Sequence, residues 1–543
     1  GKNLQFGFFE YVGYSTWVKR GDEEPLETSA NAFKQRTNYW LSYSKPLLYT
    51  WHLLDYLGEE TMDTIMHSYY RDWEFKHPYP EDYFAYFEKF SDKDLNWYTH
   101  DVFYETGRVD YSVTIEGSEA VFKNMGDLTL PFEAAFYDKK RNEISRHWYE
   151  NVKKIRRVSL PKGAKSVIID PDQTLPDGNR PNNATSKPLT FTWVFDQPQY
   201  YKREIFWLPW IFSGNAYNGW TPGLNFYHGF VPGYDYGIGI RPLWDFQNEQ
   251  LVGSAKASKT LYNFRNFYTS SFSIDASRYA GRAGVHFGFV GNRKKHLERY
   301  PVWKTIFNLD YHNIDKNAVD TAYYKTGEIA VGYAEVEYHN RPNPFLNYYF
   351  RTALKSGLSN NNQFLRINLQ TNIYYKFTKK LKAKLRIWAG GFLYADKLPQ
   401  QYRTYLSGNI DPDFRKNYIF NRTPDLNDAS IGTRQYDIGG PSLHGLILDE
   451  NGKMLGVDSW VISANFEMNI PKVPGKPFMD AAIIPGGDSY FDFGLKKTFG
   501  PLSIIMPLYQ SWDETPFVTD TDWVLDRLRF SLTLSGFTMR DLF

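Results

Sequence analysis

Apolar and polar residues alternate with a period of two through much of the C-terminal two thirds of the chain. In residues 363–377 the odd-numbered positions are mostly apolar and the even-numbered positions are mostly polar. The alternation resumes after the turn at 378–380, and it returns in residues 526–537. A strand places successive side chains on opposite faces, so each segment predicts a strand with one apolar and one strongly polar face.

Segments of this kind recur along residues 188–543, and about fourteen to sixteen of them can be distinguished. Strands of about ten residues with one apolar face, joined hairpin after hairpin, are typical of a transmembrane β-barrel. No run approaches the ~18–20 apolar residues that a membrane-spanning helix needs. We therefore predict a closed, transmembrane antiparallel β-barrel over residues 188–543.

The first 187 residues follow other patterns. In residues 1–107, Leu47, Leu48, Trp51 and Leu54 recur at helical spacing, and Gly58 marks a helix stop. Similar patterns near 62–73, 80–87 and 95–102 complete a small α-helical domain. Residues 108–187 change to short alternating segments divided by turn residues, which predicts a small β-sandwich that ends in a linker.

Oxygen-bearing residues gather near the end of the sandwich region. Asp170, Asp172 and Asp177 lie within fourteen residues together with three asparagines. Such a set is compatible with calcium, but the spacing is not that of an EF-hand loop. Asp and Asn are also ordinary residues of tight turns, and turn chemistry is the favoured interpretation.

The amino-acid composition excludes several kinds of function and of metal site. The 543 residues include 63 basic and 61 acidic ones, so no global field favours nucleic acid. The absence of cysteine excludes disulfides and thiolate metal sites. An aromatic content of 18% fits aromatic belts at two membrane interfaces. Because the sequence starts at Gly1 without Met or a signal peptide, we expect the native product to be longer.

Four stretches of the helical part resemble a known enzyme family. Tyr43-x-Lys45, residues 57–60, residues 69–73 and residues 75–82 are similar to the region just after the metal site of the M1 zinc aminopeptidases. In that family a tyrosine before x-Lys stabilises the oxyanion of peptide hydrolysis, and the resemblance implies this role for Tyr43. The alternative is that Tyr43 is an aromatic packing residue at a helix start.

The departures from the M1 pattern concern the metal. The family needs His-Glu-x-x-His, and no such motif occurs in the 543 residues. Phe6 stands where the third ligand, a glutamate, is expected. Either the protein is a pseudo-peptidase or its zinc ligands lie upstream of Gly1. We predict no metal and no cofactor in this chain, with zinc only if a missing N-terminal portion carries the site.

The end of the chain resembles a second family. Residues 491–495, 499–502 and 529–532 are similar to the final three strands of the Omp85 (surface antigen) superfamily. That resemblance implies sixteen strands and a long extracellular loop that folds back into the lumen, here residues 396–459. The predicted loop-tip motif consists of Gly439, Gly440, Leu443, His444 and Gly445. His444 replaces the family's arginine, which engages an acidic partner on the barrel wall, and tandem POTRA-like repeats are not evident. Both departures argue against translocation.

Strand alternation also predicts which side chains face the lumen. Seven of them are basic: Arg366, Lys376, Lys382, Lys384, Arg386, Arg527 and Arg529. Asp275, Asp310, Glu467 and Asp492 are expected to face them. A salt-bridged, plugged interior is favoured over a selective pore. Trp388 and Trp460 are expected to anchor the outer aromatic girdle.

Three functional hypotheses follow. The favoured one is an outer-membrane β-barrel of a Gram-negative bacterium that anchors a periplasmic, catalytically incomplete M1 peptidase-like domain. It would act as an accessory or scaffold subunit of a complex for outer-membrane protein assembly or export. Its expected partners are outer-membrane lipid and other outer-membrane or periplasmic proteins, without nucleic acid. The alternatives are the C-terminal part of a membrane-tethered M1 zinc aminopeptidase and an Omp85-type translocase.

Overall fold

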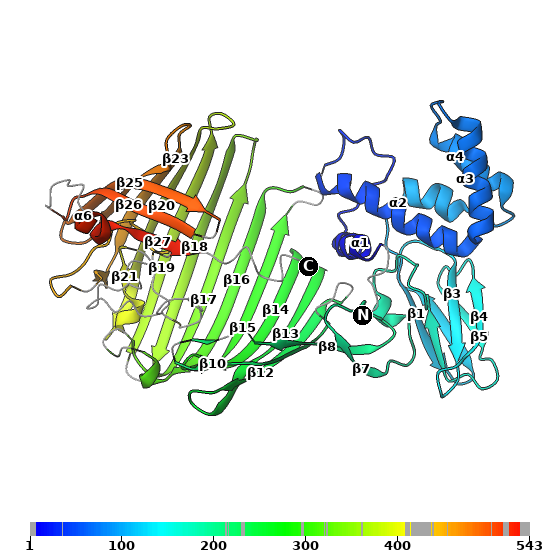
Figure 1. The fold of residues 1–543 in the computed structure, drawn as a ribbon, viewed down its shortest axis with the longest axis horizontal. Coiled ribbons are helices and arrows are strands. Elements are labelled where there is room, and N and C mark those ends of the chain that lie inside the picture. The colour runs from blue at the N-terminus through cyan, green and yellow to red at the C-terminus, as the bar shows by residue number, and fades with distance from the viewer. Residues whose placement is uncertain are drawn as a thin grey trace.

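The computed structural model describes residues 7–34, 36–211, 214–215, 217–229, 234–294, 298–319, 321, 324–359, 362–407, 413, 436, 439–452, 454–500, 502–513 and 521–532. Helices come first, two small sheets follow, and one large curved sheet makes up the rest (Figure 1). No helix among those described combines the length and the hydropathy needed to cross a bilayer.

The N-terminal part is helical, as its periodicity predicts. It contains α1 (Phe8–Arg20), α2 (Arg36–Leu57), α3 (Glu59–Trp73), α4 (Pro80–Phe90), a π-helical turn (Trp97–Asp101) and α5 (Val102–Tyr104). Gly58 separates α2 from α3 with a φ of 83°, a backbone conformation that favours glycine. Pro80 opens α4, where the Asp82 carboxylate accepts the Tyr79 N–H at 2.8 Å.

Two three-stranded sheets follow the helices. One contains β1 (Tyr111–Glu116), β2 (Glu119–Asn124) and β5 (Ile155–Ser159), and the other contains β3 (Phe132–Tyr137), β4 (Glu143–Tyr149) and β6 (Ser166–Ile169). Phe122 and Phe132 pack edge-to-face between them, with ring centroids 5.3 Å apart. The same buried cluster continues into the helices through Tyr49 and Phe87. We call the helices and these two sheets together the head.

The carboxylates near the end of the sandwich bind backbone amides. Asp170 accepts the N–H groups of Thr174 and Leu175 at 2.8 and 3.0 Å. Asp177 accepts the Tyr111 N–H at 2.8 Å and the Asn179 N–H at 2.7 Å. These are the contacts of turn-forming carboxylates. Among the described residues, no group of three or more His, Asp or Glu side chains is arranged to hold a metal ion.

These carboxyls should make the stability of the head depend on pH. Burial raises the pKa of Asp170 and of Asp177 to about 7. The pKa of each carboxyl is higher in the folded than in the unfolded chain. Both carboxyls therefore stabilise the head fully below about pH 4, and this stabilisation is lost as the pH rises through 7. His52, whose pKa burial lowers to about 4, acts in the opposite direction between pH 4 and 6.5.

Two carboxyls outweigh one imidazole in this range. We expect the unfolding free energy of the head to fall by about 1.4 kcal/mol per pH unit between pH 4 and 6.5. Replacing Asp177 with Asn should make that slope shallower by about 1.4 kcal/mol per pH unit, because one carboxyl with a raised pKa is removed. Thermal unfolding of the full chain in detergent, followed by tryptophan fluorescence, measures both slopes. A wild-type midpoint that rises with pH over this range would contradict the prediction.

Within the part of the chain that the structure describes, the large sheet contains seventeen strands. They are β7 (Leu189–Trp193), β8 (Arg203–Trp210), β11 (Gly223–His228), β12 (Tyr236–Asp245), β13 (Gln250–Phe264), β14 (Phe267–Tyr279), β15 (Arg282–Lys294), β16 (Val302–Ile314), β17 (Gly327–Asn340), β18 (Leu346–Ser359), β19 (Asn362–Lys376), β20 (Lys382–Asp396), β23 (Val461–Asn469), β24 (Lys476–Ile483), β25 (Ser489–Phe499), β26 (Leu502–Gln510) and β27 (Arg529–Leu532). Two short pairs, β9 (Gly214–Asn215) with β10 (Gly219–Trp220) and β21 (Thr404–Tyr405) with β22 (Gly456–Val457), lie in the loops.

The sheet departs from the predicted barrel in three respects. There are seventeen strands instead of fourteen to sixteen, because β7 adds to the edge of β8 as a parallel strand. The order of the strands is that of a closed barrel, but within the described residues the sheet is not closed, since no register between β27 and β7 joins its two ends. Finally, α6 (Thr521–Arg527) replaces the start of the predicted last strand, so Arg527 ends a helix. Residues 533–537 of that prediction lie outside the described residues.

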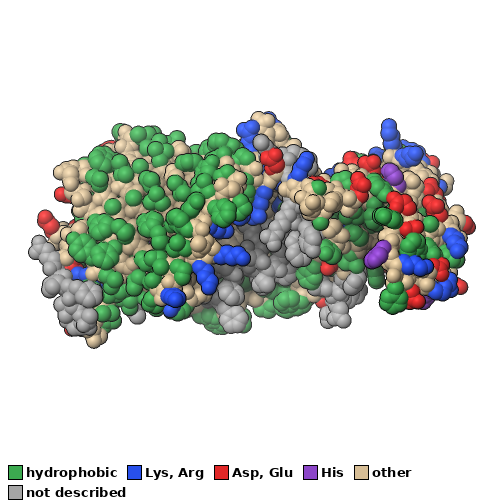
Figure 2. All heavy atoms as spheres, turned by 90° about the horizontal axis from the view of Figure 1, so that it is seen from above, with side chains coloured by type: hydrophobic (Ala, Val, Ile, Leu, Met, Phe, Trp, Pro, Cys, Tyr) green, Lys and Arg blue, Asp and Glu red, His purple; other side chains and the backbone are tan. Residues whose placement is uncertain are grey.

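One face of the sheet is apolar and exposed. Along β19 the odd-numbered Leu365 and Leu369 are exposed, whereas the even-numbered Phe364 and Gln370 are buried. Figure 2 shows hydrophobic side chains covering the wall of the sheet on the side in view, whereas the head carries mixed charges. An apolar outer face on strands whose inner face is polar is the arrangement that a lipid environment requires.

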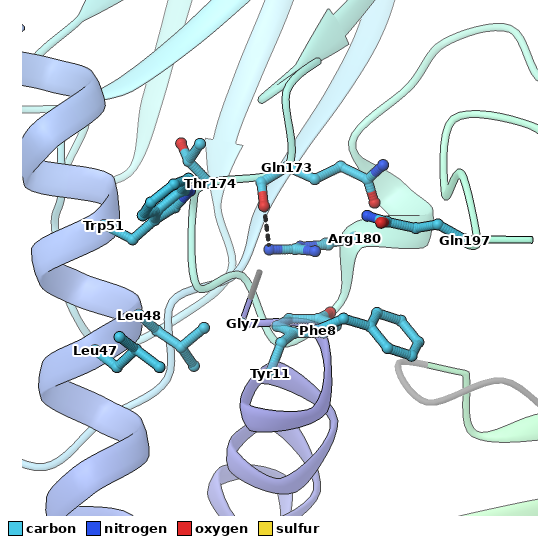
Figure 3. Close-up of a pocket in the computed structure, with 10 residues that line it drawn as sticks. All are labelled: Gly7, Phe8, Tyr11, Leu47, Leu48, Trp51, Gln173, Thr174, Arg180 and Gln197. Carbon is cyan, nitrogen blue, oxygen red and sulfur yellow. Dashed lines mark hydrogen bonds between the residues drawn. The ribbon is translucent and has the colours of Figure 1, made fainter. Parts of the chain in front are cut away.

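The head is fixed to one rim of the sheet by ion pairs. Lys19 of α1 lies 3.2 Å from Asp235, before β12, and Asp22 lies 3.1 Å from Lys294, at the end of β15. We call this edge of the sheet the head-side rim. A cavity of about 20 Å³ lies nearby, between the start of α1, α2 and the 173–180 segment (Figure 3). Arg180 projects into it and stacks on Tyr11, 3.7 Å from the ring centroid. The cavity has room for about one water molecule.

Candidate functional site in the lumen of the sheet

The segment 439–447 lies inside the sheet, although it comes from the long loop between β20 and β23. Leu443 is fully buried, and its N–H donates to the Leu406 carbonyl at 2.9 Å. Gly440 has a φ of 57°, which turns the chain back at this point. Most of residues 408–438 of the predicted loop lie outside the described residues. We call residues 439–447 the loop tip.

His444 binds an aspartate on the sheet wall. Its Nδ1 and its backbone N–H both lie 2.7 Å from Oδ2 of Asp480 on β24. Its ring packs on Phe478 and Tyr436, with centroids 4.3 and 4.8 Å away. Lys496 Nζ lies 3.5 Å from Nε2. A carboxylate can only accept, so Nδ1 donates its proton to Asp480.

The residue after His444 must be small. The Gly445 N–H donates to Oδ2 of Asp492 on β25. A Cβ atom at position 445 would lie 2.6 Å from the Trp512 ring and 2.7 Å from Asp492. Because the wall approaches so closely, only glycine lets this amide reach its carboxylate.

Two buried arginines hold the backbone of the loop tip from different strands. Arg529 on β27 donates from Nη1 to the carbonyls of His444 and Gly445, at 2.9 and 3.3 Å. Arg386 on β20 donates to the Pro441 carbonyl at 3.2 Å and also to the Gly440 carbonyl. Charged donors make stronger hydrogen bonds than neutral ones. The loop tip therefore ties β20, β24, β25 and β27 together.

An apolar cluster fixes the other side of the loop tip. Trp388 is 2% exposed and packs with Leu406, Leu443 and Ile447. The prediction that Trp388 anchors the outer girdle is therefore wrong. Even-numbered residues of β20 point inward, so Trp388 shares the face of Arg386. Trp460 is 46% exposed.

Shortening the Trp388 side chain should weaken the packing that holds the loop tip against the sheet. Trp388→Ala leaves a cavity against Leu443, and aromatic-to-alanine changes in cores cost about 3–5 kcal/mol. We expect faster amide hydrogen exchange across residues 442–447, together with a lower guanidinium midpoint in detergent. Trp460→Ala is the matched control, since its ring is half exposed. Equal changes in both variants would show that Trp388 does not hold the loop tip.

The predicted lumen residues lie in four separate places in the structure. Arg386 and Arg529 meet at the loop tip, whereas Arg366 donates to Asn368 at 2.9 Å on its own strand. Lys376, Lys382 and Lys384 lie toward the head-side rim, and Lys376 pairs in register with Lys382. Arg527 instead pairs with Asp513 beside α6.

A second polar cluster in the lumen lies apart from the loop tip. Asp310 on β16 binds Arg282 at 2.5 Å and lies between His286 and His312. Tyr402 reaches the same region through Asp413. Strand alternation predicts Asp310 to face inward, but the pairing of β15 with β16 is needed to place His286 beside it. The same alternation places His312, two residues after Asp310 on β16, on the same face, whereas the sequence alone gives no signal for His286.

Tyr43 lies in the head, far along the chain from the loop tip. It is 60% exposed on α2. Phe6, the predicted substitute for a zinc ligand, lies outside the described residues. The oxyanion role of Tyr43 therefore stays a prediction.

Comparisons with known proteins bear on the sheet. Neither a family model nor a curated protein matches the sequence. Among solved structures, the chain is similar to CdiB from Acinetobacter baumannii (12% identity, TM-score 0.27, covering 70% of this chain and 62% of that one). It is also similar to BamA from Haemophilus ducreyi lacking POTRA domains 1-3 (11%, 0.31, 60% and 68%) and to CdiB from Escherichia coli (11%, 0.29, 57% and 60%).

These neighbours are barrels of the Omp85 family, which are Gram-negative outer-membrane proteins. The chain spans less than two thirds of the length of either CdiB protein. TM-scores near 0.3 are too low to carry a mechanism from one protein to another. Fold and loop tip together describe a large curved β-sheet with an apolar, exposed outer face, an N-terminal head of helices and two small sheets, and a loop held in the lumen.

Proposed function

We propose that the chain is an outer-membrane β-barrel protein of the Omp85 type that passes client proteins into or across the membrane. The observation that carries this proposal is the bond of the loop tip to β27, the last strand of the sheet. Arg529 links that strand to His444 and Gly445. A loop that binds the terminal strand inside the lumen can link movement of the loop to a change in the pairing of that strand at the sheet edge.

The seam between the last and first strands is where a client would bind. Tyr436 donates its backbone N–H to the Phe530 carbonyl of β27 at 2.7 Å, and its hydroxyl donates to Ser442 at 3.0 Å. On the other side, β7 covers the edge of β8. Strand edges inside a bilayer need backbone partners. An incoming strand of a client can supply them by β-augmentation.

Crosslinking at the seam tests this function. A photo-crosslinking residue at Ser531 of β27 should trap an unfolded outer-membrane protein precursor during its insertion. The matched control is Ser503 of β26, which pairs directly with Ser531 but lies one strand away from the seam. Equal trapping at the two positions, or none at either, would count against a client site at the seam.

The second candidate is the accessory-subunit function, which an exposed aromatic surface on the head favours. Phe75 is 99% exposed between α3 and α4, with a φ of 63°, and Tyr70 and Tyr79 are 66% and 74% exposed. Exposed aromatics of this kind are typical contacts of protein partners. A Phe75→Ser, Tyr79→Ser variant should lose a co-purifying envelope protein while crosslinking at Ser531 continues. Unchanged co-purification would remove the support for a scaffold.

A further inference from the structure

Lysines with no carboxylate close by in the sequence occupy two turns and one strand end of the head-side rim. Lys379 and Lys380 lie between β19 and β20, Lys472 lies between β23 and β24, and Lys497 lies near the end of β25. All four are exposed. The sequences 376–382, 470–476 and 496–502 contain no Asp or Glu. We call these four residues the lysine rim.

The lysine rim is one continuous feature of the sheet. The strands that carry it are neighbours, in the order β19-β20-β23-β24-β25-β26. The head is attached elsewhere on the same rim, through Asp235 and Lys294 near β12 and β15. The opposite rim bears carboxylates at its turns: Asp245, Asp315, Asp396 and Asp488. The two ends of the sheet therefore differ in charge.

Cross-strand pairing adds more positive charge behind the lysine rim. Lys376 pairs in register with Lys382, and Lys476 pairs with Lys496. Like charges placed directly opposite each other destabilise a sheet. Glu467 lies 3.0 Å from Lys496 and offsets part of this charge. An external anion at the rim would offset the remainder.

Exposed aromatic side chains lie next to the same lysines. Phe377 and Phe499 are 54% and 52% exposed, and Lys497 Nζ is 5.3 Å from the Phe499 ring centroid. Aromatic residues gather at membrane–water interfaces, and lysine stems cover apolar surface while the ammonium reaches water. Figure 2 shows Lys and Arg side chains along the end of the apolar wall that faces the head.

We propose that the lysine rim binds the phosphate groups of anionic phospholipids in the leaflet on the head side. The inference rests on the membrane placement in the proposed function. The adjoining Phe377 and Phe499 favour a lipid over a soluble acidic protein, because they put the lysines at the edge of the lipid-facing wall. Each lysine near an anionic membrane surface contributes about a 5-fold preference.

Lipid competition tests the proposal. The full chain is reconstituted into vesicles of phosphatidylcholine with 30% phosphatidylglycerol, extracted mildly and examined by native mass spectrometry for retained lipid. Wild-type protein should retain phosphatidylglycerol and phosphatidylcholine at a ratio at least about 5-fold above that of the vesicles. A variant with Lys379→Glu, Lys380→Glu, Lys472→Glu and Lys497→Glu should fall to the bulk ratio. The matched control is Lys139→Glu, Lys140→Glu, Lys153→Glu and Lys162→Glu, four exposed lysines of the head.

The outcomes separate this inference from the proposed function. Enrichment lost only in the rim variant supports lipid binding at the rim. Unchanged enrichment in that variant, equal loss in the head control, or loss of an acidic co-purifying protein with lipid selectivity intact would overturn it. Flotation with pure phosphatidylcholine vesicles checks insertion by itself. Failure of the wild type to float would contradict the membrane placement of the chain. Flotation without lipid enrichment would contradict only lipid binding at the lysine rim.

Discussion

Replacing Arg529 with alanine should release the loop tip from the last strand and reduce client transfer by at least about 100-fold. The guanidinium is buried and is bonded to the carbonyls of His444 and Gly445. Its removal leaves two buried acceptors without their charged donor, and each unsatisfied buried acceptor costs about 1–3 kcal/mol. Together the two acceptors account for about 4 kcal/mol, which corresponds to roughly 1000-fold in the ratio of bound to released loop.

Arg527→Ala provides a matched comparison. Arg527 lies two residues away and is also buried, but its partner is Asp513 and it does not bind the loop tip among the described contacts. Insertion of an outer-membrane protein into proteoliposomes measures transfer, and hydrogen exchange of residues 442–447 measures loop release. We expect loss of transfer and fast exchange in Arg529→Ala only. If transfer survives while exchange accelerates, the loop tip does not couple to the seam.

The period-two pattern was enough to predict the large sheet and the inward face of β19 and β20. Local alternation fixes which face each residue takes, and this is why Arg386 could be assigned to the lumen. The same rule, applied to β20 throughout, also places Trp388 inside. The error arose because a tryptophan was assigned by residue type, although aromatic side chains serve equally in girdles and in packed interiors.

Features that depend on distant contacts were not predictable in this way. The parallel pairing of β7 with β8 joins two short segments across a loop, and nothing in residues 189–193 specifies the direction of pairing. Arg527 and Arg529 share one alternating stretch, yet the first ends α6 and the second begins β27. Which of them reaches the loop tip is decided by the partners Asp513 and His444, which lie elsewhere in the sequence.

The loop tip shows the same limit. The resemblance points to residues 439–445 as the tip of the long loop, and the missing arginine suggests a lost contact with the wall. In the structure His444, although shorter than arginine, still binds an acidic residue on the wall. Asp480 is close enough to bind both its imidazole and its backbone N–H. Whether a histidine can reach the acidic residue depends on the distance between the loop and the sheet wall, which the sequence does not give.

The pair of His444 and Asp480 should therefore behave as one coupled unit. Asp480→Ala leaves two buried N–H donors of His444 without an acceptor, and each unsatisfied donor costs about 1–3 kcal/mol. His444→Ala removes the ring but keeps the backbone contact. We expect a smaller loss from His444→Ala than from Asp480→Ala, and a double variant less destabilised than the sum, with a coupling energy of about 1–3 kcal/mol. Guanidinium unfolding in detergent measures the cycle.

A buried carboxylate elsewhere in the sheet provides a control that distinguishes this coupling from a general loss of stability. Asp245 is fully buried and binds the N–H groups of Gln247 and Asn248 in its own turn. Asp245→Ala should destabilise the sheet, yet its cost should add to that of His444→Ala without coupling, since the two share no partner. Strict additivity between His444→Ala and Asp480→Ala would mean that the bond between the imidazole and Asp480 contributes nothing to holding the loop. Asp480 would then act through the backbone N–H of residue 444 alone, and the ring only through its packing on Phe478 and Tyr436.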